Sequence, residues 1–114
     1  MKKINTWLKK YESFWRSRDV DGVLSLFSKD VKYGNFFKIH SNFNSLREEW
    51  ESIKKQRDIV LNFEVFSKES NKYTVIWELK YRNLENKVVY LKGTYLMKLD
   101  SNNKCIYFFH CGES

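Results

Sequence analysis

Residues 72–82 read KYTVIWELKYR, and this run alternates apolar and polar side chains. Successive side chains of a β-strand point to opposite faces, so one face of the run is apolar and the other is polar. The apolar face carries Tyr73, Val75, Trp77, Leu79 and Tyr81. The pattern predicts a strand that packs one face on a core and exposes the other, which is typical of antiparallel sheets.

Three other runs have the same character, because β-branched and aromatic residues alternate over 59–67, 88–99 and 104–111. Stretches rich in Asn, Asp and Ser separate the runs, which predicts a meander of four long strands. An earlier run also alternates and predicts a first strand, in which Gly34 marks a bulge or a close approach. The inward positions of that strand are Val31, Tyr33, Asn35, Phe37 and Ile39.

The N-terminal part of the chain has a helical period instead. Apolar residues recur every three or four positions at Ile4, Trp7, Leu8, Tyr11, Phe14 and Trp15. Asp19 and Asp21 are acids suited to the start of a short second helix. That helix turns inward Val23, Leu24, Leu26 and Phe27.

Ser45 and Glu48 have the spacing of a capping box, which predicts the start of a third helix with Trp50 on its inner side. Helices followed by a strand meander predict an α+β fold, in which three N-terminal helices pack on a strongly curved, mostly antiparallel sheet. The chain of 114 residues fits a single domain, 1–114, because two cores of half that size would each be marginal.

The net charge of +7 comes from 21 Lys and Arg against 14 Asp and Glu, and the basic residues are scattered in ones and twos. Scattered charges favour a solvated surface over a nucleic-acid-binding arm. No apolar run reaches the roughly 18 residues that a membrane crossing needs. No apolar segment follows the first lysines either, so neither membrane insertion nor classical secretion is expected.

Cys105 and Cys111 fall in one predicted strand, about 20 Å apart at 3.3 Å per residue, which is too far for a disulfide. Unbridged cysteines fit a reducing compartment, and a cytoplasmic location is predicted. The two cysteines, His40 and His110 have none of the short spacings that build zinc sites, so neither a metal nor a cofactor is expected.

The predicted interior holds aromatic rings rather than acids or bases. Glu64 and Glu78 fall on the polar faces of their strands, and His110 and Cys111 are neighbours on a strand whose two faces are equally apolar. A pocket between helices and sheet is therefore predicted to be lined by Tyr11, Trp15, Tyr33, Asn35, Trp50, Trp77 and Tyr95.

The order of these elements, with the segments 26–31 (LFSKDV), 75–77 (VIW) and 91–93 (LKG), resembles the nuclear transport factor 2-like superfamily over nearly the whole chain. It looks closest to the polyketide cyclase-like (SnoaL-like) and ketosteroid isomerase-like small bacterial members. The resemblance implies a cone-shaped, cystatin-like roll with a pocket in the cone. It also implies a homodimer across the outer sheet face, where the suitable residues are Ile76, Tyr90, Leu96 and Phe108.

The isomerase residues transfer poorly to this sequence. Tyr11 matches the tyrosine that donates to the developing oxyanion, but the general-base Asp falls at about Gly34 and Asn35, and the second donor, also an Asp, falls at Tyr95. Both carboxylates are missing, so the specific isomerase activity is rejected, and Tyr11 and Tyr95 remain as oxygen-binding donors.

Three functions stay open. The first is a small-molecule-binding domain with an aromatic pocket for a small apolar or aromatic ligand. The second is an enzyme of the polyketide cyclase or isomerase type, which requires a bulge that turns His40, His110 or Asp30 inward. The third is weak, salt-sensitive binding of nucleic acid or protein through an outer sheet face that carries Lys80, Arg82, Lys92 and Lys98.

Overall fold

A computed structural model describes residues 2–35, 38–40 and 43–113, and within them six strands form one curved sheet with the order β2-β1-β6-β5-β4-β3. The strands are β1 (Phe27–Gly34), β2 (Ile39–His40), β3 (Arg57–Glu69), β4 (Lys72–Arg82), β5 (Val88–Leu99) and β6 (Cys105–Glu113). Neighbouring strands are antiparallel except β1 and β6, which run parallel.

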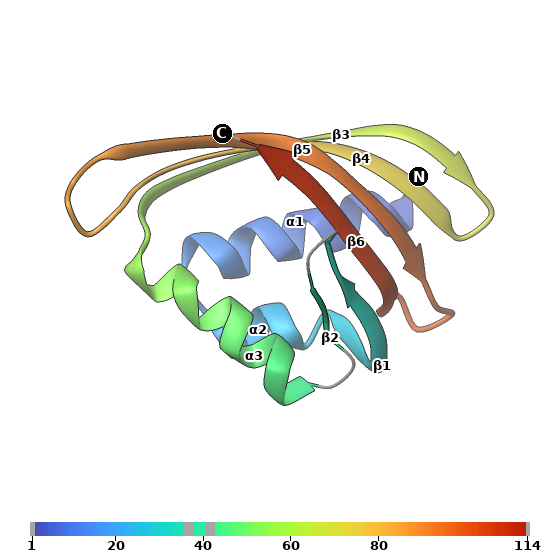
Figure 1. The fold of residues 1–114 in the computed structure, drawn as a ribbon. Helices are drawn as coiled ribbons and strands as arrows, with labels where there is room; N and C mark the ends of the chain where they lie inside the picture. The colour runs from blue at the N-terminus through green and yellow to red at the C-terminus, as the bar shows by residue number, and fades with distance from the viewer. Residues whose placement is uncertain (1, 36–37, 41–42, 114) are drawn as a thin grey trace.

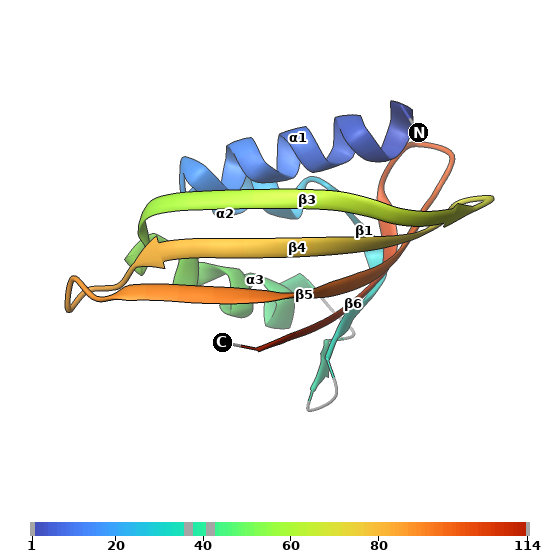
Figure 2. The same cartoon turned by 90° about the horizontal axis from the view of Figure 1, so that it is seen from above.

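The α-helices of the described chain lie on one side of this sheet (Figure 1). They are α1 (Lys2–Arg16), α2 (Val20–Leu24) and α3 (Phe43–Glu51), and the 3₁₀-helix η1 (Ser52–Lys55) follows α3. Seen from above, α1 follows the β3 side of the sheet, whereas α3 lies beneath its other half (Figure 2). Asp19 caps α2 as predicted, because its carboxylate accepts the Gly22 backbone N–H at 2.9 Å.

Aromatic rings from α1 dominate the core. Trp7 is fully buried and stacks on Tyr11 with 4.9 Å between the ring centroids. Its indole N–H donates to the Leu26 carbonyl at 3.0 Å, and the same oxygen accepts the backbone N–H of Cys105 at 2.8 Å. Helix α1, the residue before β1 and the first residue of β6 therefore meet at one carbonyl oxygen.

The predicted inner and outer faces of the long strands are confirmed. On β4, Val75, Trp77 and Leu79 are buried, whereas Glu78 and Lys80 are exposed. The same alternation holds along β3 and β5, although it weakens toward the ends of the sheet. The inner face of the sheet therefore meets the helices, and its outer face stays free of other elements of the described chain (Figure 1).

The facing of β6 is settled by a register shift against β5. Phe108 pairs with Met97 and His110 pairs with Tyr95, so both β6 residues share the inner face with these partners. Phe108 is 1% exposed and lies in the core. Its predicted place in an outer interface is therefore wrong.

The predicted first strand is wrong in its second half. β1 ends at Gly34, and the chain turns at Asn35, whose backbone N–H and side-chain oxygen both bond the backbone of Lys38 at 3.0 Å. Ile39 belongs to β2 and is 67% exposed rather than inward, and Phe37 lies outside the described residues. Gly34 is a close approach as predicted, because a Cβ there would lie 2.4 Å from the Lys38 carbonyl oxygen.

In the part of the chain that the structure describes, every helix is too short or too polar to cross a bilayer. Cys105 and Cys111 are both free thiols on β6, as their spacing predicts. Burial raises the pKa of the Cys105 thiol well above its ordinary value, so this group is an inert part of the core.

Candidate functional site

A cavity of about 180 Å³ lies between the helices and the inner face of the sheet, and we call it the inner cavity. Its wall includes six of the seven residues predicted to line a pocket: Tyr11, Trp15, Tyr33, Trp50, Trp77 and Tyr95. The seventh, Asn35, stands in the turn after β1 and does not line this cavity. The structure brings the six together, and their contact with a ligand stays a prediction.

Two tyrosines form the polar centre of the inner cavity. The hydroxyls of Tyr11 on α1 and Tyr95 on β5 are 3.0 Å apart, so one donates to the other, and the second O–H has no further acceptor among the described residues. Burial raises the pKa of Tyr11, Tyr33 and Tyr95 above the ordinary value. All three phenols therefore stay protonated near neutral pH and act as hydrogen-bond donors.

Three tryptophan rings complete the wall, and their indole N–H groups differ in partner. Trp15 donates to the side-chain oxygen of Gln56 at 2.7 Å. The buried indole nitrogens of Trp50 and Trp77 lack a hydrogen-bond partner among the described residues. Trp50 lies near the Tyr33 hydroxyl and lowers its pKa, but the two groups do not reach hydrogen-bond geometry. Unpartnered buried donors are rare in folded proteins, so the N–H groups of Trp50 and Trp77 require an explanation.

His110 is the ionisable group that the register shift of β6 turns toward the inner cavity. Its ring lies 5.4 Å from the Tyr33 ring between centroids. Burial lowers the pKa of His110, the nearby Glu49 opposes this effect, and His40 adds to it. The imidazole is therefore neutral at pH 7 and has one nitrogen able to accept a proton.

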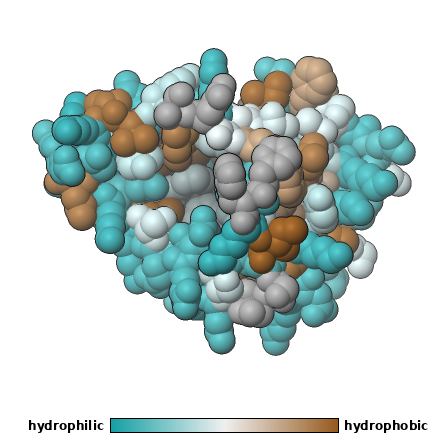
Figure 3. Space-filling model, in the orientation of Figure 1, coloured by the Kyte–Doolittle hydropathy of each residue, from teal (hydrophilic) through white to brown (hydrophobic). Residues whose placement is uncertain are grey.

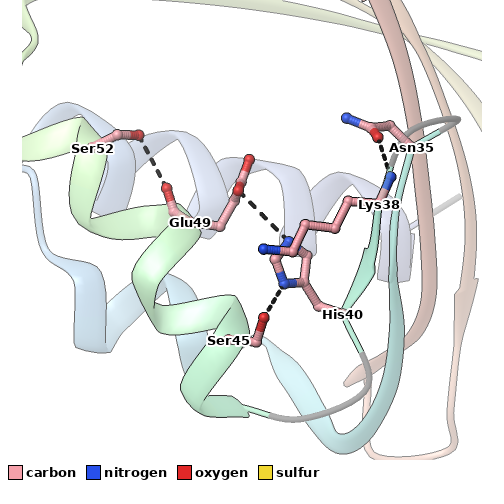
Figure 4. Close-up of polar contacts among 6 residues, drawn as sticks. All are labelled: Asn35, Lys38, His40, Ser45, Glu49 and Ser52. Carbon is pink, nitrogen blue, oxygen red and sulfur yellow. Dashed lines mark hydrogen bonds and ion pairs between the residues drawn. The ribbon is translucent and has the colours of Figure 1, made fainter.

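Glu49 reaches the rim of the inner cavity from α3 and pairs with a buried histidine (Figure 4). In His40, Nε2 is 3.6 Å from the Glu49 carboxylate and Nδ1 is 2.5 Å from the Ser45 hydroxyl. The predicted capping box is wrong, because α3 begins at Phe43 and Ser45 bonds this imidazole from inside the helix. The contacts of His40 with Glu49 and Ser45 link β2 to α3. Neither His40 nor Ser45 lines the inner cavity.

A second, larger hollow of about 790 Å³ opens at the C-terminal end of β6, and we call it the sheet-end hollow. Asn35 lines it together with parts of β4, β5 and β6. Trp77, Leu91 and His110 line both this hollow and the inner cavity. The two spaces are therefore neighbours that share a wall.

The outer sheet face carries apolar and basic side chains together. Ile76, Tyr90 and Leu96 are 38%, 46% and 43% exposed. Of the basic residues, Lys92 stands opposite Glu78, and Lys98 lies over the Tyr107 ring. Figure 3 shows the molecule from the side, in the orientation of Figure 1, and this side is mainly hydrophilic with separate hydrophobic patches. Glu78 and Tyr107 reduce the free positive charge that Lys92 and Lys98 offer to nucleic acid. Nucleic-acid binding through this face therefore gains no support.

Sequence reasoning missed the polar residues of the inner cavity. Glu49 and Gln56 lie on or just after the third helical segment, where the alternation rule for strands gives no information. The sequence does not determine the facing of His110, because both faces of its strand are apolar. Asp30 is exposed, so it does not supply an inward acid. Among the described residues, no group of His, Cys, Asp and Glu is arranged to hold a metal ion.

The sequence matches neither a family model nor a curated protein. Solved structures match it in fold. A nuclear transport factor 2-like protein of unknown function from Exiguobacterium sp. has a TM-score of 0.78 at 17% identity, covering 95% of this chain and 98% of that one. Δ5-3-ketosteroid isomerase from Mycobacterium sp. has a TM-score of 0.79 at 15% identity, covering 96% and 92%.

SalBIII, an epoxide hydrolase/cyclase-like enzyme with a role in pyran ring formation in the polyether salinomycin, has a TM-score of 0.83 at 12% identity. The match covers 98% of this chain and 92% of that one. The chain thus has the nuclear transport factor 2-like fold, as the resemblance of its sequence implies. At these identities the likeness concerns the fold alone, because one fold hosts many activities.

Proposed function

We propose that this protein binds a small, mainly apolar molecule in the inner cavity and holds an oxygen atom of that molecule by hydrogen bonds. The observation that carries the proposal is the pair of buried indole N–H groups of Trp50 and Trp77, which find no acceptor in the described protein. Burying a donor without a partner costs about 1–3 kcal/mol. A ligand oxygen that accepts either N–H would recover that free energy.

The size of the cavity limits the ligand. An apolar cavity of about 150 Å³ holds benzene, whereas pockets for drug-sized ligands have about 300–1,000 Å³. At about 180 Å³ the inner cavity suits one aromatic ring with a short substituent. The ring faces around it favour an aromatic or conjugated ligand over a flexible chain.

The donors define the chemistry of the substituent. One hydroxyl of the Tyr11–Tyr95 pair and the indole N–H groups offer protons to a ligand. A carbonyl or ether oxygen is therefore the complementary group, and an aryl ketone is the simplest probe with both features. The structural neighbours with named activities handle small organic molecules, which supports a ligand-binding use of this fold.

The test compares acetophenone with α-methylstyrene, in which a CH₂ group replaces the carbonyl oxygen at nearly equal shape. Calorimetry should show acetophenone binding about 2- to 13-fold more tightly, which corresponds to one net hydrogen bond of 0.5–1.5 kcal/mol. Trp50→Phe and Trp77→Phe, tested separately, should reduce this preference in at least one variant. Equal affinities for the two probes, or no binding of either, would overturn the proposal.

A second candidate function is proton transfer at carbon next to a carbonyl, and the inward, neutral imidazole of His110 favours it. The C–H bond breaks, the proton moves to the free ring nitrogen, and the electron pair moves to the ketone oxygen, which Tyr11 or Tyr95 stabilises. In D₂O, NMR should show deuterium entering the methyl group of acetophenone. His110→Asn should stop this exchange, whereas exchange at the uncatalysed rate with the unchanged protein would exclude the activity for this ketone.

We also propose the finer features that the resemblance implies. These are a cone-shaped, cystatin-like roll and a homodimer that covers the outer sheet face. A second copy suits this face because it presents both Glu78 and Lys92 beside apolar Ile76 and Leu96, so a two-fold axis can pair opposite charges around an apolar centre. A cytoplasmic location is proposed on the two free cysteines.

A further inference from the structure

Trp77 is the largest of the three residues that line both spaces described above, the other two being Leu91 and His110. The Trp77 side chain is 6% exposed and lines both the inner cavity of about 180 Å³ and the sheet-end hollow of about 790 Å³. The hollow lies within the usual size range of ligand pockets, and the inner cavity lies below it. The indole therefore separates a space for one ring from a space for a larger molecule.

The absence of a side chain at Gly112 allows the Trp77 ring to lie in this position. Gly93 is the cross-strand partner of Trp77, and Gly112 is the partner of Gly93, so the three form one row across β4, β5 and β6. A Cβ on Gly112 would lie 2.4 Å from the indole ring of Trp77. Any larger residue at 112 would push this rigid ring away, since real Cβ contacts are never so short.

The ring is held by packing rather than by hydrogen bonds. It stacks on Tyr95 with 5.5 Å between centroids and 19° between planes, and its N–H finds no acceptor among the described residues. Trp15, in contrast, is tied to Gln56 by a hydrogen bond at 2.7 Å. The position of Trp77 thus depends on the space left by Gly112 and on the stacking contact with Tyr95.

We propose that Trp77, whose ring lies against Gly112, is the residue that limits ligand size at this site. The inference rests on the proposed function, because it concerns ligands of the inner cavity. With the indole in place, the site accepts aryl ketones of one ring. Without the indole, the two spaces join past Leu91, and fused aryl ketones of two or three rings can extend from the inner cavity into the sheet-end hollow.

The test uses three probes that share one methyl ketone and differ in ring number: acetophenone, 2-acetonaphthone and 2-acetylphenanthrene. Trp50→Leu is the matched control, because Trp50 is equally buried, lines the inner cavity and also has an unpartnered N–H, but does not line the sheet-end hollow. Calorimetry should show that Trp77→Leu binds 2-acetylphenanthrene at least tenfold more tightly than the unchanged protein does. Trp50→Leu should show no such gain.

The outcomes separate the two proposals. If the unchanged protein binds none of the ketones, the proposed function fails. If it binds acetophenone but Trp77→Leu gains no affinity for the larger ketones, only the size limit fails. An equal gain in Trp50→Leu would also overturn the size limit, since enlargement anywhere would then suffice.

Gly112→Ala provides a second test if Trp77→Leu does not fold. Gly22→Ala is its control, because a Cβ on Gly22 would lie 2.3 Å from the Phe14 ring, a comparable clash on α2 away from both spaces. We expect Gly112→Ala to change the ratio of acetophenone to 2-acetonaphthone affinity at least threefold and Gly22→Ala to leave it unchanged. An unchanged ratio in folded Gly112→Ala would contradict the role of Trp77.

Discussion

The buried hydroxyl pair of Tyr11 and Tyr95 makes a quantitative prediction about stability. The two oxygens are 3.0 Å apart, and both side chains are at most 3% exposed. Tyr11→Phe removes one hydroxyl and leaves the other without its partner, which costs about 1–3 kcal/mol. Tyr95→Phe should cost a similar amount for the same reason. Each variant should therefore melt about 8 °C lower if the loss is about 2 kcal/mol.

The double variant distinguishes a real pair from two independent losses. Removing both hydroxyls leaves no buried polar group behind, so the double variant should lose only about 1–2 kcal/mol rather than the roughly 4 kcal/mol of two added singles. Urea unfolding followed by circular dichroism measures all four proteins, and equal m-values would show that the same surface unfolds in each. Additive losses within about 0.5 kcal/mol would refute the hydroxyl contact.

Three further predictions concern other parts of the molecule. His110 has a lowered pKa in the folded protein and an ordinary value of 6.5 when unfolded, so the unfolded chain takes up its proton first as the pH falls. His110 should therefore reduce the free energy of unfolding below about pH 6.5. In urea titrations, the free energy of unfolding of His110→Gln should fall less steeply as the pH is lowered. Parallel curves for the two proteins would contradict this prediction. In sedimentation equilibrium, Leu96→Lys on the outer face should shift the protein from dimer to monomer, whereas Leu84→Lys in the β4–β5 turn should not. A monomeric parent protein would refute the dimer proposal. Gly34→Ala places a Cβ 2.4 Å from a backbone oxygen, so it should lower the free energy of unfolding by about 1–3 kcal/mol, and a change below about 0.5 kcal/mol would argue against the close approach.

The sequence predicts the sheet faces well because each long strand has one clearly more apolar side. Trp77 and Leu79 are inward and Glu78 is outward, as their alternation requires. Alternation does not predict the facing of a strand whose two faces are equally apolar. Both faces of β6 are apolar, so only its register against β5, a long-range property, decides that His110 points inward.

Alternation also fails to detect a tight turn inside an apolar run. The residues from Val31 to Ile39 alternate as one strand would, yet the chain reverses at Asn35, whose side chain bonds the backbone of Lys38. The capping motif at Ser45 fails for a related reason. Its hydroxyl has a competing partner in His40, and a sequence motif contains no information about a histidine that folding brings alongside.

The parallel pairing of β1 with β6 has a consequence for how the chain reaches its native state. Phe27 pairs with Cys105, so the contact that fixes α1 and β1 on the sheet closes a loop of most of the chain. Pairings this distant in sequence slow folding, because the entropy of loop closure must be overcome before the contact forms. On the ribosome, α1 and β1 emerge first but cannot complete their packing until β6 has been synthesised. Trp7 therefore lacks its contact with Phe108 until β6 has been synthesised, and this aromatic helix is open to aggregation during that time.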